Sequence, residues 1–225
     1  MKDALNKALD PHWPVWDRPV RVIHWYFPLA VTFMWWTREE GYMQWHSWCG
    51  YSLLVVVLTR LTWGFFGSHY ARFTQFIESP ITVWRYVRGA DFDGVGHNPV
   101  GGYSTLILLL LITVQGLTGL ASSDDILFEG PLAYWAADYS STLTEWHTLN
   151  WLLLVSVIVV HVFAIAFYSL IRKQKLIIVM WRGYEPGRIS HWKPVNAWWA
   201  FSAAIVWSLL LAAVITLAPQ APSYY

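Results

Sequence analysis

The sequence predicts an all-α integral membrane protein that forms a single domain over residues 1–225. Of its 225 residues, 56% are hydrophobic and only 13% are charged, a composition unlike that of soluble domains. The chain also contains 17 tryptophans, and aromatic side chains gather where a membrane meets water. A helix needs about 20 residues to cross a bilayer, and apolar segments of nearly this length recur along the chain. These observations place the chain in membrane lipid, and we expect no nucleic-acid partner.

Five apolar segments are long enough, or nearly so, to cross a membrane: 20–36, 45–66, 101–121, 146–171 and 194–218. The first is the shortest and contains Pro28, where we expect a kink. Residues 1–19 are charged and contain no apolar run, so they do not resemble a cleaved signal peptide. We therefore expect the first helix to remain as an anchor and the last segment to form an additional transmembrane helix.

The lysines and arginines predict the orientation. With five crossings the loops alternate between the two sides, and all but one of the 15 basic residues then share a side; the exception is Arg38. Because basic residues mark cytoplasmic loops, we expect a cytoplasmic N-terminus and an external tail at 219–225. The external loop 122–145 has no basic residue and five acidic ones, so it would suit a partner with a basic or neutral contact patch. These acidic residues are Asp124, Asp125, Glu129, Asp138 and Glu145.

Four histidines sort into two pairs by their depth in the membrane. His147 and His161 are fourteen residues apart, almost four helical turns, so their side chains point the same way about 21 Å apart along the helix. With this topology His147 lies near the external face and His161 toward the cytoplasm. His46 begins the second helix at the external face, and His24 lies in the cytoplasmic half of the first. The pairs at matching depth are His46 with His147 and His24 with His161.

Paired imidazoles in a membrane favour haem. Ionisable groups inside membrane segments are expensive and usually functional, and neutral imidazole is a common axial ligand of haem iron. One such histidine taken alone could instead be a hydrogen-bonded core or interface residue. Zinc would need a closed four-ligand cluster, which pairs so far apart cannot form. The single Cys49 excludes a Cys-x-x-Cys-His attachment or an iron–sulfur cluster. We therefore predict two non-covalent haems b.

Several motifs resemble a known family. They are the segment 16–25 (Trp-Asp-Arg-Pro-Val-Arg-Val-Ile-His-Trp), His46 with Gly50 one turn later, the loop 96–102 (Gly-His-Asn-Pro-Val-Gly-Gly), and the histidines of the fourth helix. Together, over residues 14–185, they resemble the bacterial cytochrome b561 superfamily, in particular the b-type cytochrome subunits of nickel–iron hydrogenases. The fifth helix at 194–218 departs from the usual four-helix core.

The resemblance implies a four-helix bundle that holds two haems b, ligated by His24, His46, His147 and His161, in a bacterial inner membrane. It further implies electron transfer across that membrane between the quinone pool and a periplasmic hydrogenase or c-type cytochrome. We expect an electron-transfer subunit of a respiratory complex, since no nucleophile is grouped with a base. A stand-alone quinone-linked enzyme that takes electrons from superoxide is the main alternative, and a haem-free channel or scaffold is a third.

Other residues have weaker signals. Arg21 and Arg60, together with Arg18, fall at the cytoplasmic edge, where haem propionates would emerge, and arginine binds carboxylates well; membrane insertion explains these charges equally. Glycines such as Gly116 and Gly119 would allow close approach of a helix or a porphyrin. His97 is either part of the family-like loop or a capping or surface residue. Residues 67–98 look like an amphipathic segment on the inner leaflet, or the roof of a quinone site, with apolar residues Phe73, Phe76, Ile81, Trp84, Tyr86 and Val87.

Overall fold

The computed structural model of the chain describes residues 14–124, 128–185 and 192–219. Lys2, Lys7, Asp125 and Arg188, which contribute to the predicted charge pattern, lie outside these ranges. Within them, the regular structure is helical, and an isolated β-bridge between Ser123 and Glu129 accompanies it. The predicted all-α class is confirmed.

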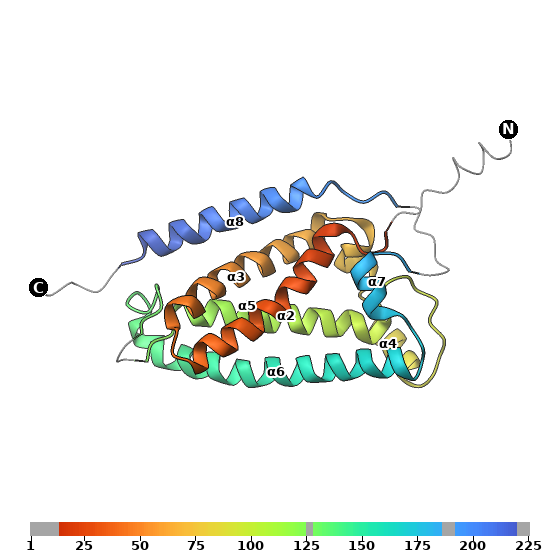
Figure 1. Cartoon of the computed structure of the whole chain (residues 1–225), viewed down its shortest axis with the longest axis horizontal. Coiled ribbons are helices and arrows are strands. Elements are labelled where there is room, and N and C mark those ends of the chain that lie inside the picture. The colour runs from red at the N-terminus through yellow and green to blue at the C-terminus, as the bar shows by residue number, and fades with distance from the viewer. Residues whose placement is uncertain (1–13, 125–127, 186–191, 220–225) are drawn as a thin grey trace, which may run out of the picture.

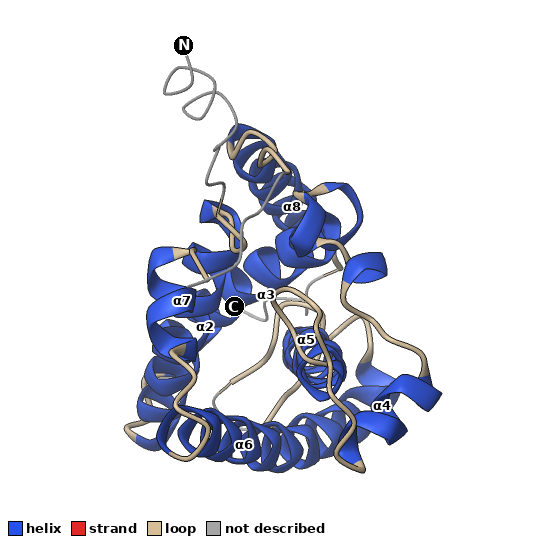
Figure 2. Ribbon diagram, turned by 90° about the vertical axis from the view of Figure 1, so that its right-hand side faces the viewer, coloured by secondary structure: helices blue, strands red, loops and turns tan. Residues whose placement is uncertain are grey.

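Five long helices lie alongside one another and alternate in direction (Figure 1). They are α2 (Arg18–Glu39), α3 (Met43–Phe66), α5 (Pro99–Leu120), α6 (Ser140–Leu170) and α8 (Trp198–Leu217). α3 packs against α2, α5 and α8, and α6 packs against α5. Seen along the helices, α8 lies outside the group formed by the other four (Figure 2). Helix α3 is therefore the element on which most of the packing depends.

Four helices are long and apolar enough to cross a membrane: Met43–Phe66, Pro99–Leu120, Ala137–Leu170 (η3 with α6) and Trp198–Leu217. The chain is therefore a multi-pass membrane protein. Helix α2 is not among the four. Its 22 residues span about 33 Å at 1.5 Å per residue, but Arg18, Arg21, Arg38 and Glu39 at its two ends lower its hydropathy.

Helix starts follow local capping chemistry. The Asp17 carboxylate accepts a hydrogen bond from Val20 N at 2.9 Å, and Pro19 occupies the first turn of α2. The Asn98 side chain accepts from Gly101 N at 2.7 Å at the start of α5, again before a proline. The short polar side chain accepts a hydrogen bond from one free backbone N–H of the first turn, and the proline has no N–H that would need a partner. The Asp-Arg-Pro and Asn-Pro sequences therefore define where α2 and α5 begin.

The connection between α3 and α5 corrects one prediction. It forms two 3₁₀ turns, η1 (His69–Ala71) and η2 (Phe73–Gln75), and the short helix α4 (Pro80–Val87). Phe73 and Phe76 are buried in the core, so the predicted amphipathic surface segment is wrong for the first part of 67–98. Gly102 allows this burial, because a Cβ there would lie 2.5 Å from Phe76 O. The exposed apolar side chains lie later in the connection, at Ile77 and, on α4, at Ile81, Trp84 and Val87.

A further short helix, α7 (Leu176–Arg182), covers the start of α2. It ends at Gly183, whose φ of 89° is one that glycine tolerates. There Trp16 N donates to Gly183 O at 3.1 Å, and the Arg21 guanidinium donates to Trp181 O at 2.7 Å. Trp16 and Val179 belong to one buried apolar cluster with Trp63. These contacts join the segment after α6 to the N-terminal end of α2.

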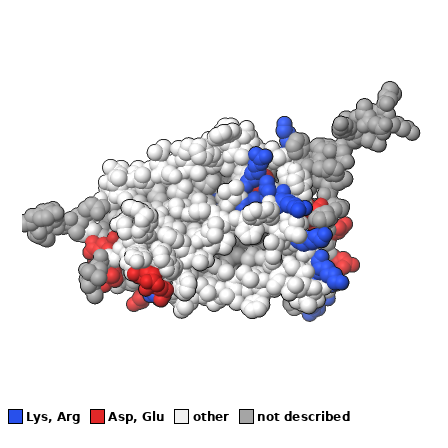
Figure 3. All heavy atoms as spheres, in the orientation of Figure 1, with Lys and Arg blue, Asp and Glu red and all other residues white. Residues whose placement is uncertain are grey.

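Charged side chains are separated along the helix axes (Figure 3). Most lysines and arginines lie at the end of the molecule where α2 begins, together with some acidic residues. At the opposite end, in the view of Figure 3, acidic side chains predominate. The middle of the surface carries no visible charge in this view, as expected for a surface that faces lipid.

The main core lies between α3, α5 and α6. Leu54 and Val57 of α3, Leu109 of α5 and Leu154 of α6 are each at most 4% exposed. Gly116 lets the helices approach, since a Cβ there would lie 3.0 Å from Leu54 Cδ1. Without a hydrophobic driving force between helices in lipid, this close packing is a main source of stability.

Two adjacent leucines of α5 test the packing. Leu109 is 4% exposed and Leu110 is 61% exposed. We expect Leu109→Ala to reduce the free energy of unfolding by about 2 kcal/mol or more, because it leaves a cavity, and Leu110→Ala to have little effect. Thermal denaturation of the purified protein in detergent measures both. Equal losses for the two variants would contradict this core.

Candidate functional site

The structure brings the imidazole rings of His46 on α3 and His147 on α6 next to each other. Their ring centroids are 6.5 Å apart and the ring planes are inclined by 73°. A metal–imidazole nitrogen bond is about 2 Å for zinc, so an ion shared by two imidazoles needs roughly twice that distance between the coordinating nitrogens. A centroid separation of 6.5 Å is compatible with one such ion between the rings. His46 and His147 are therefore a candidate ligand pair.

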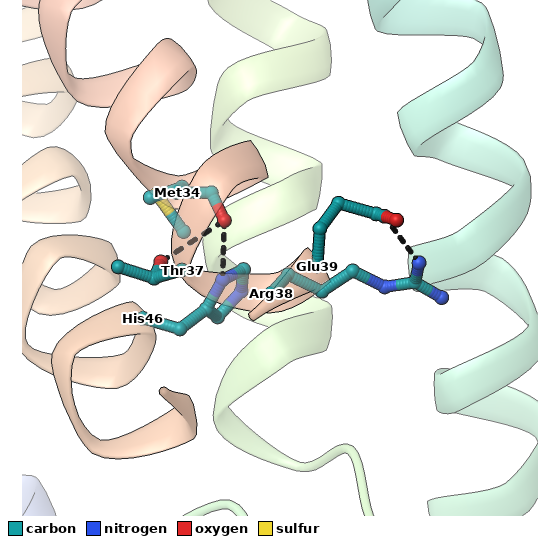
Figure 4. A network of polar contacts seen from close by, with 5 residues as sticks. All are labelled: Met34, Thr37, Arg38, Glu39 and His46. Carbon is teal, nitrogen blue, oxygen red and sulfur yellow. Dashed lines mark hydrogen bonds and ion pairs between the residues drawn. The ribbon is translucent and has the colours of Figure 1, made fainter. Parts of the chain in front are cut away.

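The His46 imidazole is held by a backbone carbonyl. Its Nδ1 lies 3.0 Å from Met34 O, which also accepts from the Thr37 hydroxyl at 3.1 Å (Figure 4). A carbonyl oxygen only accepts hydrogen bonds, so Nδ1 carries the hydrogen and Nε2 has the free lone pair. Metal-binding histidines commonly donate their second ring N–H to a carbonyl in this way.

The His147 imidazole has the same arrangement. Its Nδ1 donates to Gln115 O at 3.0 Å, which again leaves the lone pair on Nε2. Unlike that of His46, this lone pair accepts a hydrogen bond from the Gln115 side-chain amide, whose nitrogen lies 3.1 Å away. Gly119 makes space for the ring, since a Cβ at this position would lie 2.9 Å from His147 Cε1. The two neighbouring histidines therefore present the same nitrogen as a possible ligand.

His24 of α2 and His161 of α6 form the second predicted pair. Both side chains are half-buried, and the two are close enough to interact electrostatically. His24 Nδ1 is buried and has no hydrogen-bond partner. The structure therefore brings His24 and His161 into one neighbourhood, and their role as ligands stays a prediction.

Two arginines near this second pair, Arg60 and Arg21, have buried nitrogens without hydrogen-bond partners. Arg60 is 4% exposed, its guanidinium lies 5.5 Å from the centre of the Phe73 ring, and its Nη1 has no hydrogen-bond partner. Arg21 Nε is also buried without a partner. Asp17 interacts electrostatically with Arg60, but its carboxylate accepts from Val20 N and from Trp63 Nε1 at 2.7 Å. Buried guanidinium groups with unused donors fit a carboxylate-bearing group such as a haem with its propionates. Arg18, in contrast, is exposed.

His97 lies close enough to Arg60, His161 and His24 to interact with them electrostatically, a position that the sequence did not predict. It is neither a cap nor a surface residue: Asn98 caps α5, and the His97 ring packs on Trp16 and Phe76 with centroids 4.6 and 4.5 Å away. Its Nε2 lies 3.1 Å from Thr105 Oγ1. Burial, followed by the nearby positive charge of Arg60, lowers the His97 pKa to about 3, so the ring is neutral at neutral pH. The Asn-Pro cap signal could have shown that His97 precedes the helix.

The described residues contain no group of three or more histidine, cysteine, aspartate or glutamate side chains that could hold a metal ion. The histidines stand in pairs instead. A pair of neutral imidazoles suits haem iron, because the porphyrin supplies the other ligands and the protein adds only the axial ones. The donor set of His46 and His147 fits haem b.

Residues 15–183 match the family model of prokaryotic cytochrome b561. The chain belongs to this family. Three relatives are each described as a probable Ni/Fe-hydrogenase B-type cytochrome subunit. The one from Azotobacter chroococcum is 25% identical over 217 residues, which covers 77% of this chain and 90% of the relative. The one from Bradyrhizobium diazoefficiens is 24% identical over 209 residues, with 75% and 84% covered. The Azotobacter vinelandii protein is 25% identical over 219 residues.

No solved structure matches the chain. Membership of the cytochrome b561 family implies a b-type cytochrome, hence haem b and a role in electron transfer. The family resemblance stated from the histidines and the loop 96–102 is therefore confirmed.

Gly119 tests the position of His147. In Gly119→Val, the new side chain would occupy the space of the His147 ring, and we expect the haem b content per chain to fall. Gly116→Ala, one turn earlier on α5, is the control, since its Cβ would meet flexible Leu54 rather than a histidine. The pyridine haemochrome assay measures both. Unchanged haem content in Gly119→Val would rule out this placement of the ring.

Proposed function

We propose that this cytochrome holds two haems b and transfers electrons across the membrane between an external redox partner and the quinone pool. His46 and His147 are the axial ligands of the outer haem, and His24 and His161 are those of the inner haem. The observation that carries the proposal is the pairing of His46 with His147. Their ring centroids are 6.5 Å apart, and each Nδ1–H donates to a backbone carbonyl. Each haem, when bound, accepts and releases one electron at a time.

The protein's contribution is to fix the ligands and to surround them with apolar side chains. Two imidazole ligands fill both axial positions of each iron, so this ligation favours electron transfer over oxygen chemistry. At the inner haem, Arg60 and Arg21 bind the propionates. The unpartnered buried nitrogens of these arginines support this role. The carboxylates would supply the counter-charge that buried guanidinium groups need.

We further propose that α2 crosses the membrane with the other four long helices. It lies against α3, runs antiparallel to it and has a similar length, 22 against 24 residues. Helices α2, α3, α5 and α6, within residues 14–185, then form the haem-binding bundle, and α8, within 194–218, is the additional helix. The basic end would face the cytoplasm of a bacterial inner membrane, with the N-terminus inside and the C-terminus in the periplasm.

The external partner is a periplasmic hydrogenase or a c-type cytochrome. The names of the relatives support the hydrogenase. The acidic loop supports a partner with a basic contact patch, because Glu129, Asp138 and Glu145 are exposed and the loop immediately precedes the helix of His147. Tyr134, Trp135 and Tyr139 are also exposed there and provide apolar contact area. Quinone would react near the inner haem, beside the polar groups of Asp17, Arg21 and the connection 67–98.

Histidine replacement tests the two haems. Parent protein should contain two haems b per chain, all released by acidified acetone because none is covalently bound. His46→Ala and His147→Ala should each remove the same haem, and His24→Ala and His161→Ala the other, since a haem that loses an axial ligand is held less well. Haem assay and redox titration of the b-type spectrum measure content and identity.

The half-buried His69, whose ring stacks on that of Trp192 with centroids 4.2 Å apart, offers the control, and His69→Ala should keep both haems. One haem per chain in the parent, or His24→Ala and His46→Ala removing the same haem, would reject the proposed pairs.

The acidic loop can be tested by electron exchange with a basic c-type cytochrome. We expect the triple variant Glu129→Gln, Asp138→Asn, Glu145→Gln to slow the exchange about tenfold at low salt, since charge steering raises association rates by 10-fold or more. The difference should shrink at high salt, because salt screens exposed charges. Glu78→Gln with Asp91→Asn, at the opposite end, should leave the rate unchanged. A triple variant that matches the parent at every salt concentration would argue against docking here.

A further inference from the structure

A cluster of buried polar side chains surrounds the His147 imidazole. Gln115 and Thr118 of α5 and Asn150 of α6 are 7%, 6% and 6% exposed. Polar side chains inside membrane helices are unfavourable unless they are hydrogen-bonded. All three have such bonds, and their bonds converge on a single ring.

Thr118 adds a second acceptor for the His147 Nδ1–H group. The Thr118 hydroxyl has one hydrogen, which it donates to Val114 O at 2.8 Å. Its oxygen lies 3.1 Å from His147 Nδ1 and can therefore accept from it. Together with Gln115 O at 3.0 Å, Thr118 gives Nδ1–H two acceptors. The neighbouring ligand His46 has one, Met34 O, which it shares with Thr37.

Asn150 orients the Gln115 side chain. Its Nδ2 donates to Gln115 Oε1 at 2.5 Å and to Leu111 O at 2.9 Å. Because Oε1 is engaged by Asn150, the Gln115 amide nitrogen is the atom that faces His147, 3.1 Å from Nε2. Nε2 is the nitrogen that haem iron would take, so the Gln115 amide has to turn away from it when haem binds, whereas both acceptors of the Nδ1–H group can remain.

We propose that Thr118 is a positioning residue for His147. Its hydroxyl oxygen, together with Gln115 O, fixes the tautomer and ring orientation, and Thr118 lowers the reduction potential of the outer haem. This inference rests on the proposed haem between His46 and His147. An acceptor at Nδ1–H makes the imidazole a more basic ligand, and a more electron-donating ligand favours oxidised iron. The outer haem would therefore have two unequal axial ligands.

The test uses Thr118→Val in the full-length, haem-loaded protein. Valine has the same shape as threonine but cannot accept the hydrogen bond. We expect the haem that His147→Ala removes to become easier to reduce, by about tenfold in the equilibrium constant, or about 59 mV for a one-electron couple. Haem content and the potential of the other haem should not change. Redox titration of the b-type spectrum gives both potentials.

Three further variants separate positioning from a general effect on the fold. Thr118→Ser keeps the hydroxyl and should restore the parent potential. Thr113→Val removes an equivalent bond on the same helix, from the Thr113 hydroxyl to Leu109 O at 2.7 Å, and should leave both potentials unchanged. Asn150→Leu releases the Gln115 side chain without removing either acceptor of the His147 Nδ1–H group, and should leave both potentials unchanged.

The possible outcomes distinguish the inference from the proposed function. Unchanged potentials in Thr118→Val, with both haems present, would overturn the inference and leave the two-haem proposal intact. An equal shift in Thr113→Val would also overturn it. If His147→Ala retains both haems, the proposed function itself fails.

Discussion

A polar atom inside the bilayer has no water to bind, so it must find its partner within the protein. Most hydroxyl groups of the long helices do so locally. Thr59 and Thr62 on α3 and Ser156 on α6, for example, each donate to the carbonyl four residues earlier. Polar groups that also bond across helices are therefore informative, because a hydroxyl can be satisfied by a carbonyl of its own helix. Gln115, Thr118 and Asn150, near His147, are among these groups.

The two ends of the molecule satisfy this constraint differently. Around His147, the polar side chains bond to one another and to helix carbonyls, so each of them has a hydrogen-bond partner within the protein. Around His24, Arg60 Nη1 and the Nδ1 atoms of His24 and His97 are buried without partners. A buried cation without a well-placed counter-charge destabilises the fold. The end that holds Arg60 thus depends more strongly on a bound anionic group than the end that holds His147.

The sequence predicted the features that depend on helical periodicity and membrane depth. A spacing of fourteen residues placed His147 and His161 on one side of α6, and alternating crossings matched His46 with His147, whose rings do lie next to each other. Features that depend on tertiary contacts were not predictable. Gln115, Thr118 and Asn150 are ordinary polar residues in apolar segments, and only the packing of α5 on α6 brings them to His147. Phe73 and Phe76 lie among arginines in the sequence, yet they turn into the core because glycines at 64 and 102 leave room for them.

The modest hydropathy of α2 has a consequence for how the chain enters the membrane. A segment with arginines near both ends is poorly retained in lipid by itself. Helix α3, which follows after the short turn 40–42, is long and apolar enough to cross a membrane. Buried contacts join the two, including the hydrogen bond between His46 and Met34 O. We therefore expect α2 and α3 to be integrated during synthesis as a single helical hairpin, so that the first helix becomes stable in the bilayer only after the second has been made.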